Sequence, residues 1–322
     1  MSKFFFVVLL AAAAGGGYYF YKNYEICGLD KVEIRPRGEA NSGATLEEDS
    51  SPGGAGPRGV LRIATVRLGL DQARLGQRAV AALLIKTLGS FDVVAIQDIR
   101  ARHPSLLADL VAQMNAQGRA YEFALAPRVL REPVDKYSAM IFNRASVEID
   151  RATVGEVADP ARRLTTPPLV ATFRARGPSP KEALTFTLVN VEVDPTRPAE
   201  ERDVLAEVFR AVRDSGSGED DVILLGDMGG DDRHYGRLAG VANLTSVLLP
   251  GKNAEERTGL TGNLFFDRLA TLEFTGHGGV FDVMRQFGVS VQEAAEAMDQ
   301  LPIWAEFSVY EGAAGGLLPQ KK

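Results

Sequence analysis

One buried strand, Val222–Asp227, constrains the fold of this 322-residue chain more than any other stretch. Its four apolar residues lead through Gly226 to the carboxylate of Asp227, which indicates a buried strand that ends in an acidic side chain. Many α/β scaffolds build a site in this way, because the end of a buried strand reaches the surface. The pattern alone has moderate weight, because Gly-Asp after a strand is also found in plain turns.

Strand-like and helix-like segments alternate along the rest of the chain. Asp71 is placed to cap a helix that runs to about Leu88, since apolar residues recur on one face of that segment. Pro104 and Pro198 are placed to open two more helices, over residues 105–115 and 199–213. The pattern predicts strands at residues 138–143, 169–175, 184–193 and 304–310.

Composition limits the classes of protein to which the chain can belong. With 45% hydrophobic residues, it can bury one α/β core of about 250 residues. The net charge of −6, from 36 basic and 42 acidic residues, gives no strong nucleic-acid signature, because binding to nucleic acid calls for a basic face. The only cysteine, Cys27, excludes an internal disulfide and a cysteine metal cluster.

The N-terminal segment predicts attachment to a membrane. Residues 4–21 carry no charge, and eighteen helical residues span about 27 Å, close to the hydrocarbon thickness of a bilayer. Lys3 and Lys22 flank the segment, and three tyrosines near its end suit the bilayer interface. We therefore expect a single-pass anchor of unknown orientation. The alternative is a signal peptide, with export after cleavage.

Four regions follow from these patterns. Residues 1–22 are expected to form the anchor or signal peptide, and residues 23–59, rich in Gly, Ser, Pro and acids, a flexible linker. Residues 60–312 are expected to form the globular domain, and residues 313–322 a disordered tail.

Four further segments accompany the Val222–Asp227 strand in a fixed order. They are LRIATVRLG (61–69), FDVVAIQDIR (91–100), TFTLVNVEVDP (185–195) and AMDQLPIWAEF (297–307). Together these motifs resemble the endonuclease/exonuclease/phosphatase superfamily, which has the deoxyribonuclease I-like fold, over roughly residues 60–312. The resemblance implies an α+β protein, built as a four-layer α/β/β/α sandwich of two packed mixed sheets flanked by helices.

The resemblance also implies a hydrolytic site with a bound metal, because phosphodiester hydrolysis needs a cationic clamp, a base and an acid. The family's metal ligand is a glutamate, and Asp98 stands at that position. Aspartate can bind Mg²⁺, but its oxygen lies about 1.5 Å further back. A solvated or helix-capping Asp98 is the alternative interpretation. Arg67 replaces an asparagine that supports the metal, and it would compete for the same carboxylate, so we expect an Arg67–Asp98 ion pair.

Other substitutions fall on the acid, the base and a phosphate donor. Glu192 replaces the histidine of an Asn-x-His motif, and it could act as an acid at neutral pH only with a strongly raised pKa. Asp227 is retained, but Gly229 replaces an asparagine whose side chain donates to the phosphate. Asp299 is also retained, whereas Gln300 replaces the histidine that it would orient, and glutamine cannot take up a proton.

The three histidines of the chain, His103, His234 and His277, stand at neither position, although His234 could swing towards Asp227. The sequence therefore predicts a membrane-tethered pseudoenzyme that acts as a binding or interaction module with an unknown protein partner and no cofactor. One alternative is an active phosphodiesterase or phosphatase that uses Mg²⁺ or Mn²⁺, with Glu192 as the acid. The other is a purely structural domain.

Overall fold

The computed structural model describes residues 24–27, 33–36, 59–101, 104–116, 118–126, 129, 136–216, 218–230, 235–249 and 260–312. The chain divides into two compact units, Met1–Pro52 and Gly53–Lys322. In the first unit, β1 (Tyr24–Cys27) pairs with β2 (Glu33–Pro36) in antiparallel orientation, inside the segment expected to be a linker. The expected membrane segment, residues 4–21, and the expected tail, residues 313–322, lie outside the described residues.

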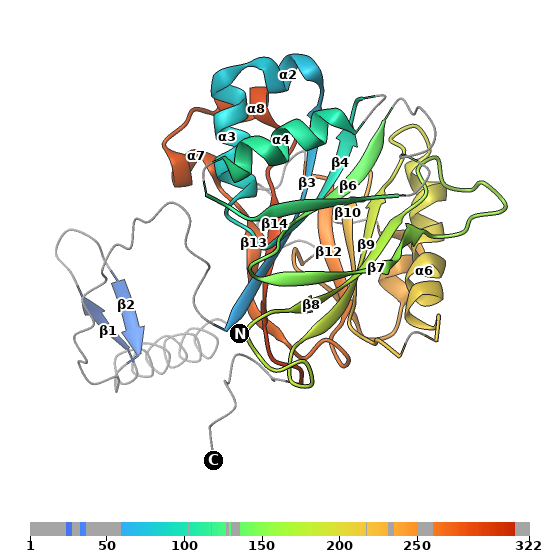
Figure 1. Cartoon of the computed structure of the whole chain (residues 1–322). Helices are drawn as coiled ribbons and strands as arrows, with labels where there is room; N and C mark the ends of the chain where they lie inside the picture. Colours follow the sequence, from blue (N-terminus) through green and yellow to red (C-terminus); the bar gives the residue numbers. More distant parts are fainter. Residues whose placement is uncertain are drawn as a thin grey trace, which may run out of the picture. The chain divides into compact units, whose positions relative to one another are not determined.

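The second unit contains two six-stranded mixed sheets (Figure 1). In the first sheet the order is β13 (Phe274–Val280), β14 (Ile303–Ser308), β3 (Val60–Leu70), β4 (Val93–Ile99), β6 (Tyr137–Asn143) and β5 (Tyr121–Leu125). In the second it is β11 (Leu244–Ser246), β12 (Gly262–Asp267), β10 (Val222–Asp227), β9 (Thr185–Glu192), β8 (Leu169–Ala175) and β7 (Val147–Glu156). The pairs β3–β4 and β9–β10 are parallel, and the other pairs are antiparallel.

Helices lie on the outer faces of both sheets (Figure 1). The helices beside the first sheet are α2 (Gln72–Gly76), α3 (Arg78–Leu88), α4 (Ser105–Asn115), α7 (Val283–Phe287) and α8 (Val291–Ala297). On the second sheet lie α6 (Pro198–Arg213) and the 3₁₀ helix η1 (Gly236–Gly240). The expected four-layer α/β/β/α sandwich is confirmed.

Strand β10 shows how the layers bury both faces of a sheet. Ile223 and Leu225 belong to the core that includes the space between the two sheets, whereas Val222 and Leu224 pack into a separate core with α6 residues such as Phe209. Alternate residues of a strand point to opposite faces, so a strand between two cores must be apolar throughout. The apolar run of β10 therefore follows from its place in the fold.

One expected element differs from the prediction. The helix expected from Asp71 to about Leu88 is two helices, because Gln77 has an extended backbone (φ −83°, ψ 114°) between α2 and α3. The expected cap is confirmed, since the Asp71 side chain accepts a hydrogen bond from the Arg74 backbone N–H at 2.8 Å. Gly76 precedes the break and weakens the helix there. Among the described residues, no helix is both long and apolar enough to span a bilayer.

Candidate functional site

The two parallel strand pairs bring four charged side chains to one region of the sandwich. Asp227 ends β10 directly opposite Glu192, which ends the neighbouring strand β9. In the other sheet, Arg67 of β3 pairs with Gln97 of β4, and Asp98 follows it. The carboxyl ends of parallel strands lie at the same sheet edge. For this reason four residues from distant sequence segments come together there.

Arg67 lies between two buried carboxylates. Its Nη1 is 3.0 Å from Asp227 Oδ2, and its Nη2 is 3.3 Å from Asp98 Oδ2. Both aspartates are only 2% exposed. The expected Arg67–Asp98 ion pair is confirmed, and the contact with Asp227 adds a second one. Burial by itself would lower the pKa of Arg67, but the charges of Asp227, Asp98 and Glu192 raise it, so the guanidinium stays charged.

Asp98 also accepts from a second arginine. Arg100 donates from Nε to Oδ1 at 3.0 Å and from Nη2 to Oδ2 at 2.6 Å. Although burial would raise the pKa of Asp98, its hydrogen bond with Arg100 and the charges of Arg100 and Arg67 lower it. The backbone of Asp98 is left-handed (φ 59°), at a bulge that interrupts the pairing of β4 with both neighbouring strands. Such a backbone is uncommon outside glycine, and it sets the direction of this carboxylate.

The other oxygen of Asp227 is held by the protein as well. Oδ1 accepts from the Gly229 backbone N–H at 2.9 Å and from the Thr261 hydroxyl at 2.5 Å. Gly229 has a φ of 65°, and a Cβ at this position would lie 2.5 Å from Cγ1 of Val193. Gly229 therefore contributes a backbone donor, in a place where the structure leaves no room for a side chain.

Gln300 closes the same hydrogen-bond chain. Its Nε2 donates to the Thr261 hydroxyl, and its Oε1 accepts from the Thr261 backbone N–H at 3.2 Å. Gln300 is thus linked through Thr261 to Asp227. The gap between Arg67, Gln300 and the strand ends has no room for a water molecule.

Asp299 contacts two arginines, whereas its neighbour Gln300 contacts Thr261. Its Oδ1 lies 2.8 Å from Nη2 of Arg74, and its Oδ2 lies 3.3 Å from Nη2 of Arg100. Gly69 makes this possible, because a Cβ there would be 2.5 Å from Asp299 Oδ2. The ion pairs form a continuous series that runs from Arg74 to Asp227 through Asp299, Arg100, Asp98 and Arg67.

Glu192 has a cation of its own. Lys136 Nζ is 2.7 Å from Oε1, and the Ser138 hydroxyl is 3.4 Å from Oε2. Glu192 is 5% exposed, and this burial raises its pKa against the opposing effect of Lys136. A general acid at neutral pH would also need a raised pKa. However, the Glu192 carboxylate is paired with the ammonium group of Lys136.

These contacts do not suit a divalent metal ion. Each oxygen of Asp98 accepts from an arginine, and Arg67 places its positive charge between Asp98 and Asp227. A metal there would have to displace Arg67, because like charges repel strongly at a few ångströms. Asp98 as a metal ligand stays a prediction that the arrangement does not favour.

The structure also contains site residues that sequence reasoning missed. Arg74, Arg100, Lys136 and Thr261 join the predicted residues, and Arg100 could have been found because it stands two residues after Asp98. His277 lies on β13, with Nδ1 3.3 Å from Glu306 Oε1. His103 and His234 lie outside the described residues.

Comparison with known proteins gives similarity in structure alone. No protein-family model matches the chain. No curated protein matches it either. The TDP2 protein of D. rerio, complexed with a single-strand DNA product, is similar with a TM-score of 0.54 and 16% identity, over 77% of this chain and 98% of the other.

A functionally unknown conserved protein from Enterococcus faecalis V583 has a TM-score of 0.54 and 13% identity, over 76% of this chain and 98% of its own. An endonuclease/exonuclease/phosphatase family protein from Bacteroides thetaiotaomicron has a TM-score of 0.51 and 13% identity, over 77% and 97% of the two chains. At these identities the similarity concerns the fold.

Proposed function

We propose that this chain, which has the deoxyribonuclease I-like fold of the endonuclease/exonuclease/phosphatase superfamily, is a membrane-tethered pseudoenzyme that serves as an interaction module. The observation that carries the proposal is the position of Arg67, whose guanidinium pairs with Asp98 and Asp227. The resemblance implies a metal ion beside the carboxylate at position 98. A fixed internal cation beside both carboxylates supplies their counter-charge but cannot activate a water molecule as a metal does.

The acid and base positions support the same conclusion. Gln300 cannot exchange a proton at physiological pH, and it is hydrogen-bonded to Thr261. Glu192 is paired with Lys136. A positioned acid or base contributes about 10²–10⁴-fold to a rate, so the loss of both leaves little of a normal hydrolase activity.

Hydrolysis assays on the full chain test the proposal. The substrates are a phosphodiester reporter, a phospholipid headgroup and single-stranded DNA, the last because the similar D. rerio protein was complexed with a single-strand DNA product. With Mg²⁺ or Mn²⁺ present, we expect no turnover above background. Turnover that disappears in Asp227→Ala would contradict the pseudoenzyme proposal.

Restoring the family residues gives a positive test of the same site. We expect the triple variant Arg67→Asn, Glu192→His and Gln300→His to gain metal-dependent activity, since it removes the cation between Asp98 and Asp227 and supplies two imidazoles. Gly229 is left unchanged, because Val193 occupies the space that its side chain would need. The matched control is Arg67→Asn alone, which removes the cation between the two carboxylates without supplying an acid or base and should stay inactive.

An active enzyme with Glu192 as its acid is the second candidate, and the raised pKa of this buried carboxyl favours it. In that case the wild-type chain would hydrolyse one of the substrates with a rate that falls as pH rises through the Glu192 pKa. Glu192→Gln would remove that activity. If the pseudoenzyme proposal is correct, wild type and Glu192→Gln are equally inactive across the pH range.

The membrane attachment is proposed from the uncharged residues 4–21. We expect the full chain in the membrane fraction after carbonate washing, and a chain lacking residues 1–22 in the supernatant. A supernatant protein with a shortened N-terminus would instead support export after signal-peptide cleavage.

A further inference from the structure

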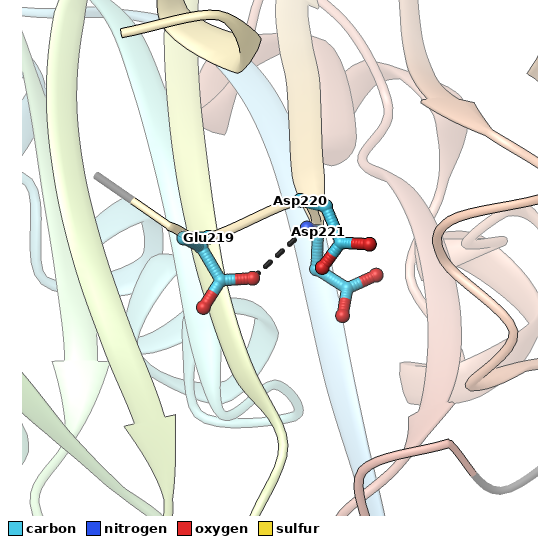
Figure 2. A group of neighbouring side chains, drawn as sticks. All are labelled: Glu219, Asp220 and Asp221. Carbon is cyan, nitrogen blue, oxygen red and sulfur yellow. Dashed lines mark hydrogen bonds between the residues drawn. The ribbon is translucent and has the colours of Figure 1, made fainter. Parts of the chain in front are cut away.

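A second cluster of charged residues lies at the opposite end of β10 from Asp227. Asp221 immediately precedes this strand, and six residues of extended chain separate the two ends by about 20 Å. The acidic cluster consists of Glu219, Asp220, Asp221, Glu273 and Glu311. In Figure 2 the carboxylates of Asp220 and Asp221 lie next to each other, while Glu219 accepts a hydrogen bond from the Asp221 backbone N–H at 2.9 Å.

The oxygens of the cluster are close enough to share one ion. Asp221, Glu273 and Glu311 each offer a carboxylate oxygen, and the three oxygens lie within 4.8 Å of one another. The same holds for Glu219, Asp220 and Asp221. Two oxygens that bind one Ca²⁺ at about 2.4 Å can be at most about 4.8 Å apart, so the spacing permits joint ligation.

Two buried carboxylate oxygens in this region have no hydrogen-bond partner among the described residues. They are Oδ1 of Asp221 and Oε2 of Glu273. Asp221 and Glu273 are each 1% exposed, and the hydroxyl of the neighbouring Thr271 acts on the Asp221 carboxyl through a side-chain hydrogen bond. Native proteins rarely leave buried polar atoms unpaired, since each costs free energy unless something binds it. These oxygens are therefore suited to bind a cation.

The two buried carboxyls of the cluster, Asp221 and Glu273, lie close together without a neighbouring cation in the described part of the chain. Within the described part of the chain, neither Asp221 nor Glu273 forms an ion pair with a lysine or arginine. Burial, followed by the charge of Glu273, raises the pKa of Asp221 to about 9. Burial also raises the pKa of Glu273. Two such carboxyls need either protons or a cation.

We propose that the acidic cluster binds one divalent cation of the Ca²⁺ type, through Asp221, Glu273 and Glu311. The donors are all oxygens, which Ca²⁺ and Mg²⁺ prefer over the nitrogen and sulfur ligands of zinc. Ca²⁺ suits the site better than Mg²⁺, because it accepts irregular geometry and carboxylates from separate segments. The site is distinct from the Arg67 region, whose carboxylates already have cations.

The surrounding contacts indicate what the ion would do. Gly312 donates its backbone N–H to Glu273 Oε1 at 2.5 Å, and the Glu311 backbone N–H donates to the Glu182 carbonyl at 2.9 Å. The ion would therefore fasten the C-terminal end of the described domain, at Glu311, to the beginnings of β10 and β13. It would act by stabilising the fold.

A thermal unfolding experiment tests the proposal on the full chain in mild detergent. After treatment with a chelator, Ca²⁺ at a hundredfold excess over its Kd should raise Tm by roughly 5 °C or more. Tb³⁺ should bind with a luminescence signal that Ca²⁺ displaces. The variant Asp221→Asn with Glu273→Gln should lose both effects, and the matched control Asp227→Asn, at the other end of β10, should keep them.

A third variant provides a test of the proposal even if the double variant does not fold. Glu311→Gln alters an exposed ligand, and it should weaken Ca²⁺ binding at least tenfold while the protein stays folded. The proposal is overturned if neither Ca²⁺ nor Mg²⁺ changes Tm, which would mean that protons neutralise the buried pair. It is equally overturned if Asp227→Asn, rather than the cluster variants, abolishes Ca²⁺ binding.

Discussion

At the scale of single residues, Arg67 pairs with two buried aspartates, of which Asp98 also pairs with Arg100. We expect Arg67→Ala to lower the free energy of unfolding by about 3 kcal/mol, since it removes the ion-pair partner of the buried Asp227 carboxylate. Urea unfolding of both proteins measures the difference.

A double-mutant cycle is the control for this prediction. Asp227→Asn keeps the acceptor oxygen for Gly229 and Thr261 but removes the charge that faces Arg67. In the Asp227→Asn background, Arg67→Ala should cost at least about 1 kcal/mol less, because contacting residues are energetically coupled. Equal costs in both backgrounds would mean that Arg67 stabilises the protein by packing alone.

Glu192 should make the stability depend on pH in a defined direction. Because its folded pKa is raised, its contribution to stability is complete below its unfolded pKa and is lost as pH rises through the folded pKa. The free energy of unfolding of the wild type minus that of Glu192→Gln should therefore fall as pH rises above about 4, the ordinary pKa of a glutamate. Urea titrations at several pH values measure it. A difference that rises with pH would contradict the assignment.

At the scale of elements, Asn190 joins the two sheets. Its Nδ2 donates to the backbone carbonyls of Ile96 (3.2 Å) and Ala139 (2.9 Å), and its Oδ1 accepts from Gln97 at 2.7 Å. All these groups are buried, so Asn190→Ala leaves several polar groups unpaired, and we expect a loss of about 2–4 kcal/mol in urea unfolding.

The matched control lies on the same strand. Thr187 shares one side-chain hydrogen bond with Thr172 at 2.9 Å, and the half-buried Thr172 can replace that bond with water. Thr187→Val should therefore cost about 1 kcal/mol or less. If both substitutions cost the same, Asn190 is not a special connection between the sheets.

Element prediction succeeded where burial alone sets the pattern. The predicted strand at residues 169–175 has the same bounds as β8, and residues 105–115 are those of α4. It failed at Gln77, because an amphipathic pattern continues through a break that only the backbone shows. Strand β7 was missed because most of its residues are partly or fully exposed and give no strong pattern.

At the scale of the whole molecule, the two ends of β10 differ in how charge is balanced. Near Asp227, three arginines and one lysine face three aspartates and Glu192. At the acidic cluster, the two buried carboxylates have no such partner among the described residues. The Arg67–Asp98 pair could be predicted because motif positions placed both residues at one site. The pair of Lys136 with Glu192 could not be predicted, because Lys136 belongs to none of the motifs.

The division of the chain into two units leads to the last prediction. The unit Gly53–Lys322 contains both sheets, the helices that cover them and both cores, so it should fold without the residues before it. We expect a chain lacking residues 1–52 to unfold in one cooperative transition, with a Tm within about 2 °C of the full chain, as measured by calorimetry. A Tm lower by about 5 °C or more, or a second transition, would mean that the N-terminal unit contributes to the stability of the sandwich.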